Sequence, residues 1–94
     1  MKILLKNETE LAVSRINRSY DVKTNSETLH IAFVNGTVLD DILLEVTNEN
    51  VENIIVKRDG QDDLQYSGFT VSANASEDIT EDGNIVNITL HKQH

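Results

Sequence analysis

Apolar residues recur at every second position along much of this 94-residue chain, in short runs that end at turn-forming residues. A period of two places successive side chains on opposite faces of a β-strand, so one face of each run can cover a core. Val, Ile and Thr together supply 26 residues, and these β-branched types favour strands. The pattern therefore predicts a domain built mainly from β-strands.

The first third of the chain predicts four strands. Asn7 and Glu8 lie at the turn of a hairpin formed by the first two. In the fourth strand, Leu29, Ile31 and Phe33 share one face, which we expect to be buried. The predicted strands are residues 2–6, 9–16, 18–23 and 28–34.

The hydrophobic period then changes to that of a helix, at Leu39, Ile42, Leu43 and Val46. This spacing predicts one helix near residues 38–47. Thr37 followed by Asp40 resembles a capping box, with Asp in place of the usual Glu or Gln. We expect Leu43 to pack against Phe33 across the core.

Three further strands are predicted after the helix, within residues 53–58, 64–75 and 85–91. The second should bend at Ser67-Gly68, where the alternation changes parity. Residues 76–84 are expected to form an acidic loop. The fold class is therefore α+β, mainly β, with about seven mostly antiparallel strands and one helix. Residues 1–94 should form a single β-rich domain, with 92–94 as a frayed tail.

Composition removes several classes of protein. The chain has no Cys, which excludes a disulfide scaffold, a thiolate metal site and a cysteine nucleophile. Val, Ile, Leu and Phe supply 29 residues, enough for one modest core. No apolar run approaches the roughly 20 residues that span a bilayer, and no signal segment is recognisable, so we expect the protein to be cytoplasmic at synthesis.

The net charge of −8 makes nucleic acid an unsuitable direct partner, because phosphate binding requires clustered Lys and Arg. The same charge opposes binding to an anionic membrane surface. The charge is also unevenly distributed, at +2 over residues 1–23 and −10 over the rest. Such asymmetry is typical of a soluble acidic protein, and it also suits head-to-tail docking between opposite faces.

No motif predicts catalysis or a cofactor. The acidic clusters at Asp59-Asp63 and Glu77-Asp82 offer the oxygen ligands that calcium prefers, but they also suit solvated loops, which we favour. His30 and His91 lie on predicted strands and would meet if these strands pair, as a zinc site requires. No Gly-rich phosphate loop or nucleophile elbow is present. We therefore expect a non-enzyme with no metal or cofactor.

The residues that best fit a docking surface are the basic residues of the first segment and the acidic residues of the predicted helix. We expect the basic residues to share a face that meets an acidic face on a neighbouring molecule. The expected surface comprises Lys6, Arg15, Arg18, Asp40, Asp41 and Glu45. Because exposed ion pairs contribute little individually, any self-association should be a weak homo-oligomer.

Three segments of the chain together suggest a family. The opening Met1–Val13 resembles small proteins encoded in the tail and baseplate regions of phages and prophages of Gram-positive bacteria. The run Asp41–Val56 is similar to their helix-then-strand segment, and the closing Val86–Leu90 matches the same layout. The resemblance implies a noncatalytic component of a virion. Some of these proteins carry a helical extension after the last strand, and we expect this protein to lack it.

Two functions follow from these observations. The first is a noncatalytic structural or protein-interaction module, in a phage or prophage tail or baseplate, that docks to other protein subunits. The second is an acidic inhibitor that imitates the phosphates of DNA and blocks a nucleic-acid-binding enzyme. Its carboxylates would line up along the helix and the turn after it, at Asp40, Asp41, Glu45, Glu49 and Glu52.

Overall fold

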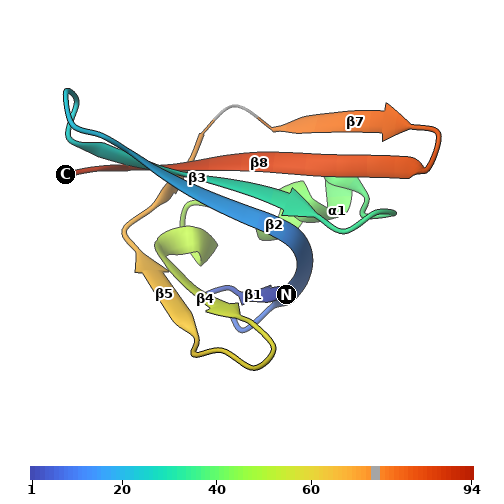
Figure 1. Cartoon of the computed structure of the whole chain (residues 1–94), viewed down its shortest axis with the longest axis horizontal. Helices are drawn as coiled ribbons and strands as arrows, with labels where there is room; N and C mark the ends of the chain where they lie inside the picture. Colours follow the sequence, from blue (N-terminus) through green and yellow to red (C-terminus); the bar gives the residue numbers. More distant parts are fainter. Residues whose placement is uncertain (73–74) are drawn as a thin grey trace.

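The computed structural model describes residues 1–72 and 75–94, and within them it confirms a mainly β fold with one α-helix. Eight described strands form one mostly antiparallel sheet (Figure 1). The strands are β1 (Lys2–Leu4), β2 (Glu10–Asp21), β3 (Ser26–Phe33), β4 (Asn53–Lys57), β5 (Leu64–Ser67), β6 (Thr70–Val71), β7 (Ser76–Thr80) and β8 (Gly83–Gln93). The helices are α1 (Leu39–Glu45) and the short 3-10 helix η1 (Asn50–Glu52).

The long strand β2 joins the two halves of the sheet. Its first residues pair with β1, and its remaining residues pair with β3, with a shift in register between Val13 and Arg15. The strand order is β5-β4-β1-β2-β3-β8-β6, and β7 pairs with β8 off this path. The irregularity lies where β2 leaves β1 for β3, and a bulge at such a point bends a strand (Figure 1).

The two ends of the sheet path are consecutive in sequence. Only Gly68 and Phe69 separate β5 from β6, so the sheet must curl to bring its ends together. Phe69 is itself buried, together with Val51 of η1. The curled sheet and the helices enclose one core, formed by Ile3, Leu5, Val13, Leu29, Ile31, Phe33, Ile42, Val46, Val51, Ile54, Val56, Phe69, Val86, Ile88 and Leu90.

The predicted alternation on β3 and β8 is confirmed, and it defines two faces of the sheet. Leu29 and Ile31 lie opposite Leu90 and Ile88, and all four side chains are buried on what we call the inner face. The intervening residues of the same strands, such as His30, lie on the outer face.

The prediction of four strands before the helix was wrong, because residues 9–16 and 18–23 contribute to one strand, β2. Its pairing with β3 continues without interruption from Arg15 to Asp21. The basic residue Arg18 does not end the strand, since its side chain forms an ion pair with Glu27 across the sheet. The structure therefore has three strands before α1 and five described strands after it.

The helix is shorter than expected, and it presents a different residue to the core. Ile42 is 3% exposed, whereas Leu43 is 46% exposed, so the expected burial of Leu43 was wrong, while Phe33 is buried as expected. The capping box is also absent: the N-cap is Val38, without a side-chain cap. The hydroxyl of Thr37 instead donates to the carbonyl of Val34, 2.7 Å away.

Two segments expected to be irregular are strands. Within the expected acidic loop at 76–84, Ser76–Thr80 form β7, which pairs with β8 through a two-residue turn. The expected frayed tail at 92–94 also differs, because β8 extends to Gln93. The long strand β3 supplies the partner for this extension, with Ser26 opposite Gln93.

The predicted bend at Ser67-Gly68 is present and gives a testable requirement for glycine. Gly68 has a φ of +80°, a conformation that costs other L-residues about 1–2 kcal/mol. A methyl group there would lie 3.3 Å from Cε of Lys92, a flexible chain end that can move away. Gly68→Ala should therefore lower the free energy of unfolding in urea by about 1–2 kcal/mol.

Ser67→Ala is the matched control for this substitution. Ser67 is exposed, so its truncation should change stability by less than about 0.5 kcal/mol. A cost for Gly68→Ala no greater than that of the control would mean that the bend does not need a positive φ.

Candidate functional site

The three basic residues expected to form one docking face do not lie together. Arg15 belongs to the outer face of β2, while Arg18 lies on the inner face beside Leu29 in the ladder. Lys6 follows β1 and forms an ion pair with Glu52, with its Nζ 3.0 Å from the carboxylate. The prediction of a shared basic face was therefore wrong, because Arg15 and Arg18 differ by three positions on a strand with a period of two.

The acidic residues expected on the helix are also dispersed. Asp40 and Asp41 are exposed in the first turn of α1, where the helix dipole favours negative charge. Glu45 lies at the last turn and accepts hydrogen bonds from Thr9 at 3.2 Å and Asn7 at 3.4 Å. Its carboxylate is therefore engaged within the protein.

Glu27 is a functional candidate that the sequence analysis missed. It lies on the same face as the buried Leu29, and its side chain is only 12% exposed. One carboxylate oxygen is 2.7 Å from Nε of Arg18, and the other is 2.6 Å from Nε2 of His94. The parity of β3 already placed Glu27 on the core face, and a buried carboxylate needs such partners.

These contacts change the pKa values of Glu27 and Arg18. The hydrogen bond from Arg18 is the largest cause that lowers the pKa of Glu27, to about 2, and the hydrogen bond from His94 adds to it. The same pairing raises the pKa of Arg18. Glu27 therefore remains charged and connects β2, β3 and the end of the chain. Its buried and occupied oxygens make this a structural cluster.

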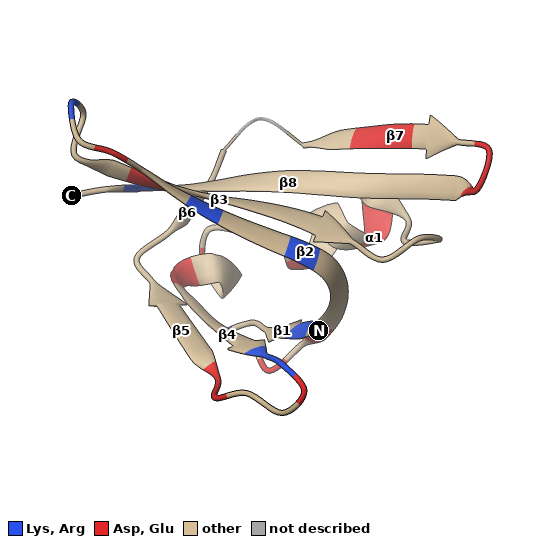
Figure 2. Cartoon of the chain, in the orientation of Figure 1, with Lys and Arg blue, Asp and Glu red and all other residues tan. Residues whose placement is uncertain are grey.

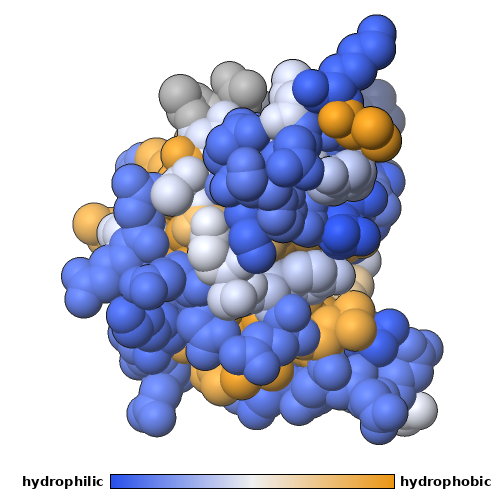
Figure 3. Space-filling view, turned by 90° about the vertical axis from the view of Figure 1, so that its left-hand side faces the viewer, coloured by the Kyte–Doolittle hydropathy of each residue, from blue (hydrophilic) through white to orange (hydrophobic). Residues whose placement is uncertain are grey.

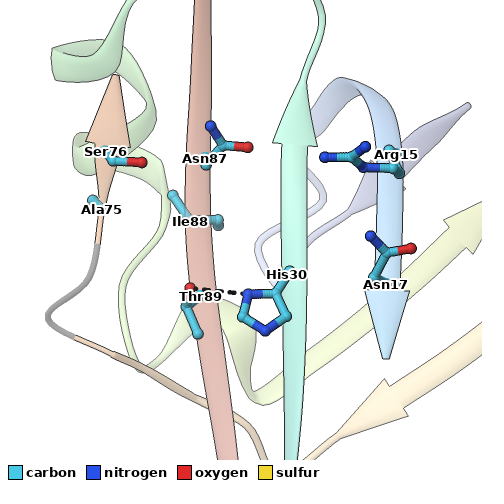
Figure 4. A pocket seen from close by; sticks show the side chains of 8 residues that line it. All are labelled: Arg15, Asn17, His30, Ala75, Ser76, Asn87, Ile88 and Thr89. Carbon is cyan, nitrogen blue, oxygen red and sulfur yellow. Dashed lines mark hydrogen bonds between the residues drawn. The ribbon is translucent and has the colours of Figure 1, made fainter. Parts of the chain in front are cut away.

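A polar groove of about 580 Å³ crosses the outer face of the sheet. Figure 4 shows the guanidinium of Arg15 extending from β2 toward β3, and Thr89 of β8 beside His30 of β3. The lining residues are Arg15, Asn17, His30, Ala75, Ser76, Asn87, Ile88 and Thr89. None of these is acidic, so the groove presents hydrogen-bonding groups and one fixed positive charge.

The groove contains one pair of groups with the types used in nucleophilic catalysis. The hydroxyl of Thr89 lies 3.4 Å from Nδ1 of His30, at the long limit of a hydrogen bond (Figure 4). An activated nucleophile also requires a third group that orients the base, and no carboxylate lines this groove. The arrangement is therefore suited to hydrogen bonding with a polar partner.

The histidines expected to approach one another lie on adjacent strands of the outer face. His30 pairs with Thr89, and His91 pairs with Thr28, so the two histidines are diagonal neighbours in the β3–β8 ladder. Within residues 1–72 and 75–94, no group of three His, Asp or Glu side chains is arranged to hold a metal ion.

The short strands β5 and β6 end the sheet path and each pair on one side only, and two longer strand segments also lack a second partner strand in the described part of the chain. From Ser14 to Asp21, β2 pairs with β3 on one side, while its pairing with β1 ends at Ala12. We call this segment the β2 edge. The strand β7 pairs with β8 alone among the described strands, and we call its outer side the β7 edge. Exposed edges of this kind present unpaired backbone groups to other chains.

The two edges carry opposite charge, as Figure 2 shows by the blue bands on β2 and the red band on β7. The β2 edge contains Arg15 and Arg18 with Asp21 at its end. The β7 edge contains Glu77 and Asp78, and the turn after it adds Glu81 and Asp82. All five residues of β7 are exposed.

The end of the molecule that carries the β2–β3 turn is mostly hydrophilic, with apolar side chains in small separate groups (Figure 3). Val22, in that turn, is 79% exposed. Isolated exposed apolar residues of this kind are normal on protein surfaces. On this face, the apolar side chains therefore mark no single docking surface.

Comparisons with known proteins identify no relative of this chain. No family model matches the chain, and no curated protein or solved structure gave a match. Among the described residues, no helix has the length and apolar character needed to cross a membrane.

Proposed function

We propose that this protein is a noncatalytic structural module that docks to other protein subunits through the unpaired edges of its sheet. It needs no cofactor or metal for this role. The observation that carries the proposal is the pair of unpaired edges, one basic and one acidic, on the sheet β2-β3-β8-β7. Strand addition at such an edge supplies main-chain hydrogen bonds, and side chains on alternate positions supply selectivity.

The charge pattern supports a protein partner. Complementary charges steer the encounter of two proteins and fix their register, even where they add little to affinity. The β7 edge, with Glu77 and Asp78, suits a basic extended segment, and the β2 edge suits an acidic one. The resemblance to tail and baseplate proteins of phages and prophages is part of the same proposal, which makes the protein a component of a virion.

The alternative of an acidic inhibitor that imitates DNA has weaker support. It requires a row of free carboxylates along α1 and the following turn. Glu45 accepts hydrogen bonds from Asn7 and Thr9, and Glu52 is paired with Lys6. Of the five carboxylates, Asp40, Asp41 and Glu49 remain exposed without such partners among the described residues, which is too few to imitate a phosphate array.

Chemical crosslinking in the organism that produces the protein tests this proposal. A carbodiimide joins carboxylates to lysines in direct contact, and the linked residues are then identified by mass spectrometry. We expect links from Glu77, Asp78, Glu81 or Asp82 to lysines of a protein subunit. Ile79→Pro, which removes a backbone donor from β7, should reduce these links.

The distribution of the links decides between the functions. Asp59 and Asp62 serve as control carboxylates, because they lie in the loop between β4 and β5, outside the two edges. Links spread equally over these residues and β7 would contradict docking through the edges. Links confined to Asp40 and Asp41 on a nucleic-acid-binding enzyme would favour the inhibitor instead.

A further inference from the structure

We propose that the partner of one edge is the other edge on a second copy of this chain, so that β7 of one molecule pairs antiparallel with β2 of the next. This inference rests on the proposed docking function and names its partner. It follows from the direction of the backbone groups on the two edges and from the order of side chains along them.

The direction of the backbone groups on β2 follows from one hydrogen bond at the far side of the sheet. The N–H of Ser72 donates to the carbonyl of Thr89, 2.9 Å away, so Thr89 directs its backbone groups toward the β6 side of β8. In an antiparallel strand these directions alternate. Ile88 therefore directs its groups toward Ile31 of β3 and exchanges hydrogen bonds with it.

The same alternation extends to the β2 edge. Because Ile31 is engaged with β8, its pair with Ile16 of β2 is of the type without hydrogen bonds. Ile16 therefore directs its N–H and carbonyl away from β3, toward the unpaired side. By alternation, Arg18 and Tyr20 do the same.

The unpaired groups of β7 follow from its hairpin with β8. A two-residue turn joins the strands, and it makes Thr80 and Gly83 a hydrogen-bonded pair. The pairs of Ile79 with Asn84 and of Glu77 with Val86 are then of the type without hydrogen bonds. Glu77 and Ile79 therefore direct their backbone groups outward, and their side chains share the inner face with Val86.

These two sets of groups match in one register. With Ile16 opposite Ile79 of the next molecule, Arg18 lies opposite its Glu77. An apolar residue then faces an apolar one, and a cation faces an anion, on the inner face of the continuous sheet. On the outer face, Asn17 lies opposite Asp78, with Arg15 two positions along the same strand. A shift of two residues in either direction loses both inner-face pairs.

The charges also select this pairing over symmetric ones. A β7–β7 contact would bring Glu77 and Asp78 of two molecules together, and a β2–β2 contact would bring two sets of arginines together. Like charges across a ladder destabilise it, so the mixed contact is favoured. A contact between two different surfaces generates a ring or an open stack of copies. The four strands β2-β3-β8-β7 would then repeat along one extended sheet.

Disulfide trapping between two single-cysteine variants tests this register. The natural chain has no cysteine, so every thiol is introduced. In the proposed register, Asn17 and Asp78 form a pair without hydrogen bonds, with Cα atoms about 4.5 Å apart, within the range of a disulfide. An equal mixture of Asn17→Cys and Asp78→Cys proteins should form the mixed dimer on mild oxidation.

Two controls make the trapping specific. The mixture of Asn17→Cys with Ser76→Cys is shifted by two residues and should give several-fold less mixed dimer. Adding Ile79→Pro to the Asp78→Cys protein removes one outward N–H and should suppress the mixed dimer. Equal yields from both mixtures, or a predominance of Asp78→Cys homodimers, would overturn the proposed pairing.

Sedimentation of the cysteine-free protein provides an independent measurement. Oligomers should form with rising concentration at low salt and diminish in about 0.5 M salt, where charges are screened within about 4 Å. Asn17→Lys faces Asp78 and should strengthen association about two- to fivefold, whereas Asn17→Asp should weaken it similarly. Gln61→Lys, in the exposed loop between β4 and β5, adds the same charge elsewhere and should have no such effect.

The outcome also distinguishes this inference from the function on which it rests. A protein that is monomeric at every concentration and salt would overturn self-pairing. Crosslinks from β7 to a different subunit in the producing organism would still support docking. If the protein does not self-associate and β7 also forms no crosslinks to another subunit, the proposed docking function itself is contradicted.

Discussion

Phe33→Ala should lower the free energy of unfolding by about 3–5 kcal/mol, as is typical when a buried aromatic side chain is truncated. Phe33 is 1% exposed at the end of β3, opposite Val13 of β2, and it belongs to the central apolar cluster. The lost stability has two parts, the free energy gained by burying the ring and the cost of the cavity that its removal leaves. Urea denaturation monitored by circular dichroism would measure it.

The helix provides the matched controls. Leu44 is 76% exposed, so Leu44→Ala should change stability by less than about 0.5 kcal/mol. Leu43 is 46% exposed and should cost far less than Phe33 when truncated, whereas Ile42→Ala should cost about 2–5 kcal/mol. A large loss for Leu43→Ala with a small one for Ile42→Ala would contradict the orientation of α1.

The sequence predicted the strands in which one face is buried, because burial imposes a period of two. Leu29, Ile31 and Phe33 on β3 and Ile88 on β8 are confirmed as core residues for this reason. The same principle failed for β7, whose five residues are all exposed. A strand that covers no core has no reason to alternate, and its identity depends on pairing with β8.

The helix shows a second limit of pattern reading. Its apolar residues occur at helical spacing, and the existence of the helix was predicted correctly. The spacing could not decide which of Ile42 and Leu43 faces the core, because both lie near one side of so short a helix. That choice depends on how the curled sheet meets α1, which is a property of the whole fold.

The candidate edges could be predicted only in part. The sequence indicated a basic first segment and an acidic remainder, and this asymmetry lies on β2 and β7 in the structure. It could not show that these strands end the sheet β2-β3-β8-β7, because strand order depends on long-range pairing. The expected shared face of Lys6, Arg15 and Arg18 failed for a local reason, because Arg15 and Arg18 lie three positions apart on one strand and therefore on opposite faces.

Glu27 makes the stability of the protein sensitive to acid. Its pKa is about 2 in the folded protein, below the ordinary value of 4.5, mainly because of the hydrogen bond from Arg18. A carboxylate with a lowered folded-state pKa contributes stability that is fully present above the unfolded value. That contribution is lost as the pH falls from about 4.5 to about 2, because the unfolded chain binds a proton that the folded protein resists.

Glu27→Gln should therefore be less stable than the natural protein at neutral pH and should lose less stability on acidification. Between pH 4.5 and 2, the natural protein should take up close to one more proton per molecule on unfolding than the variant does. Urea denaturation at a series of pH values measures this difference as a slope. The variant retains a hydrogen-bonding side chain of the same size, so the difference reports the charge on Glu27.

Glu49→Gln is the control for this titration. Glu49 is exposed, and no ion pair with it occurs among the described residues, so its substitution should leave the pH dependence close to that of the natural protein. Equal slopes for the natural protein and Glu27→Gln would show that Glu27 is not held by Arg18 and His94. Because those residues lie on β2 and at the end of the chain, the result would also test how β2, β3 and the last residues are joined.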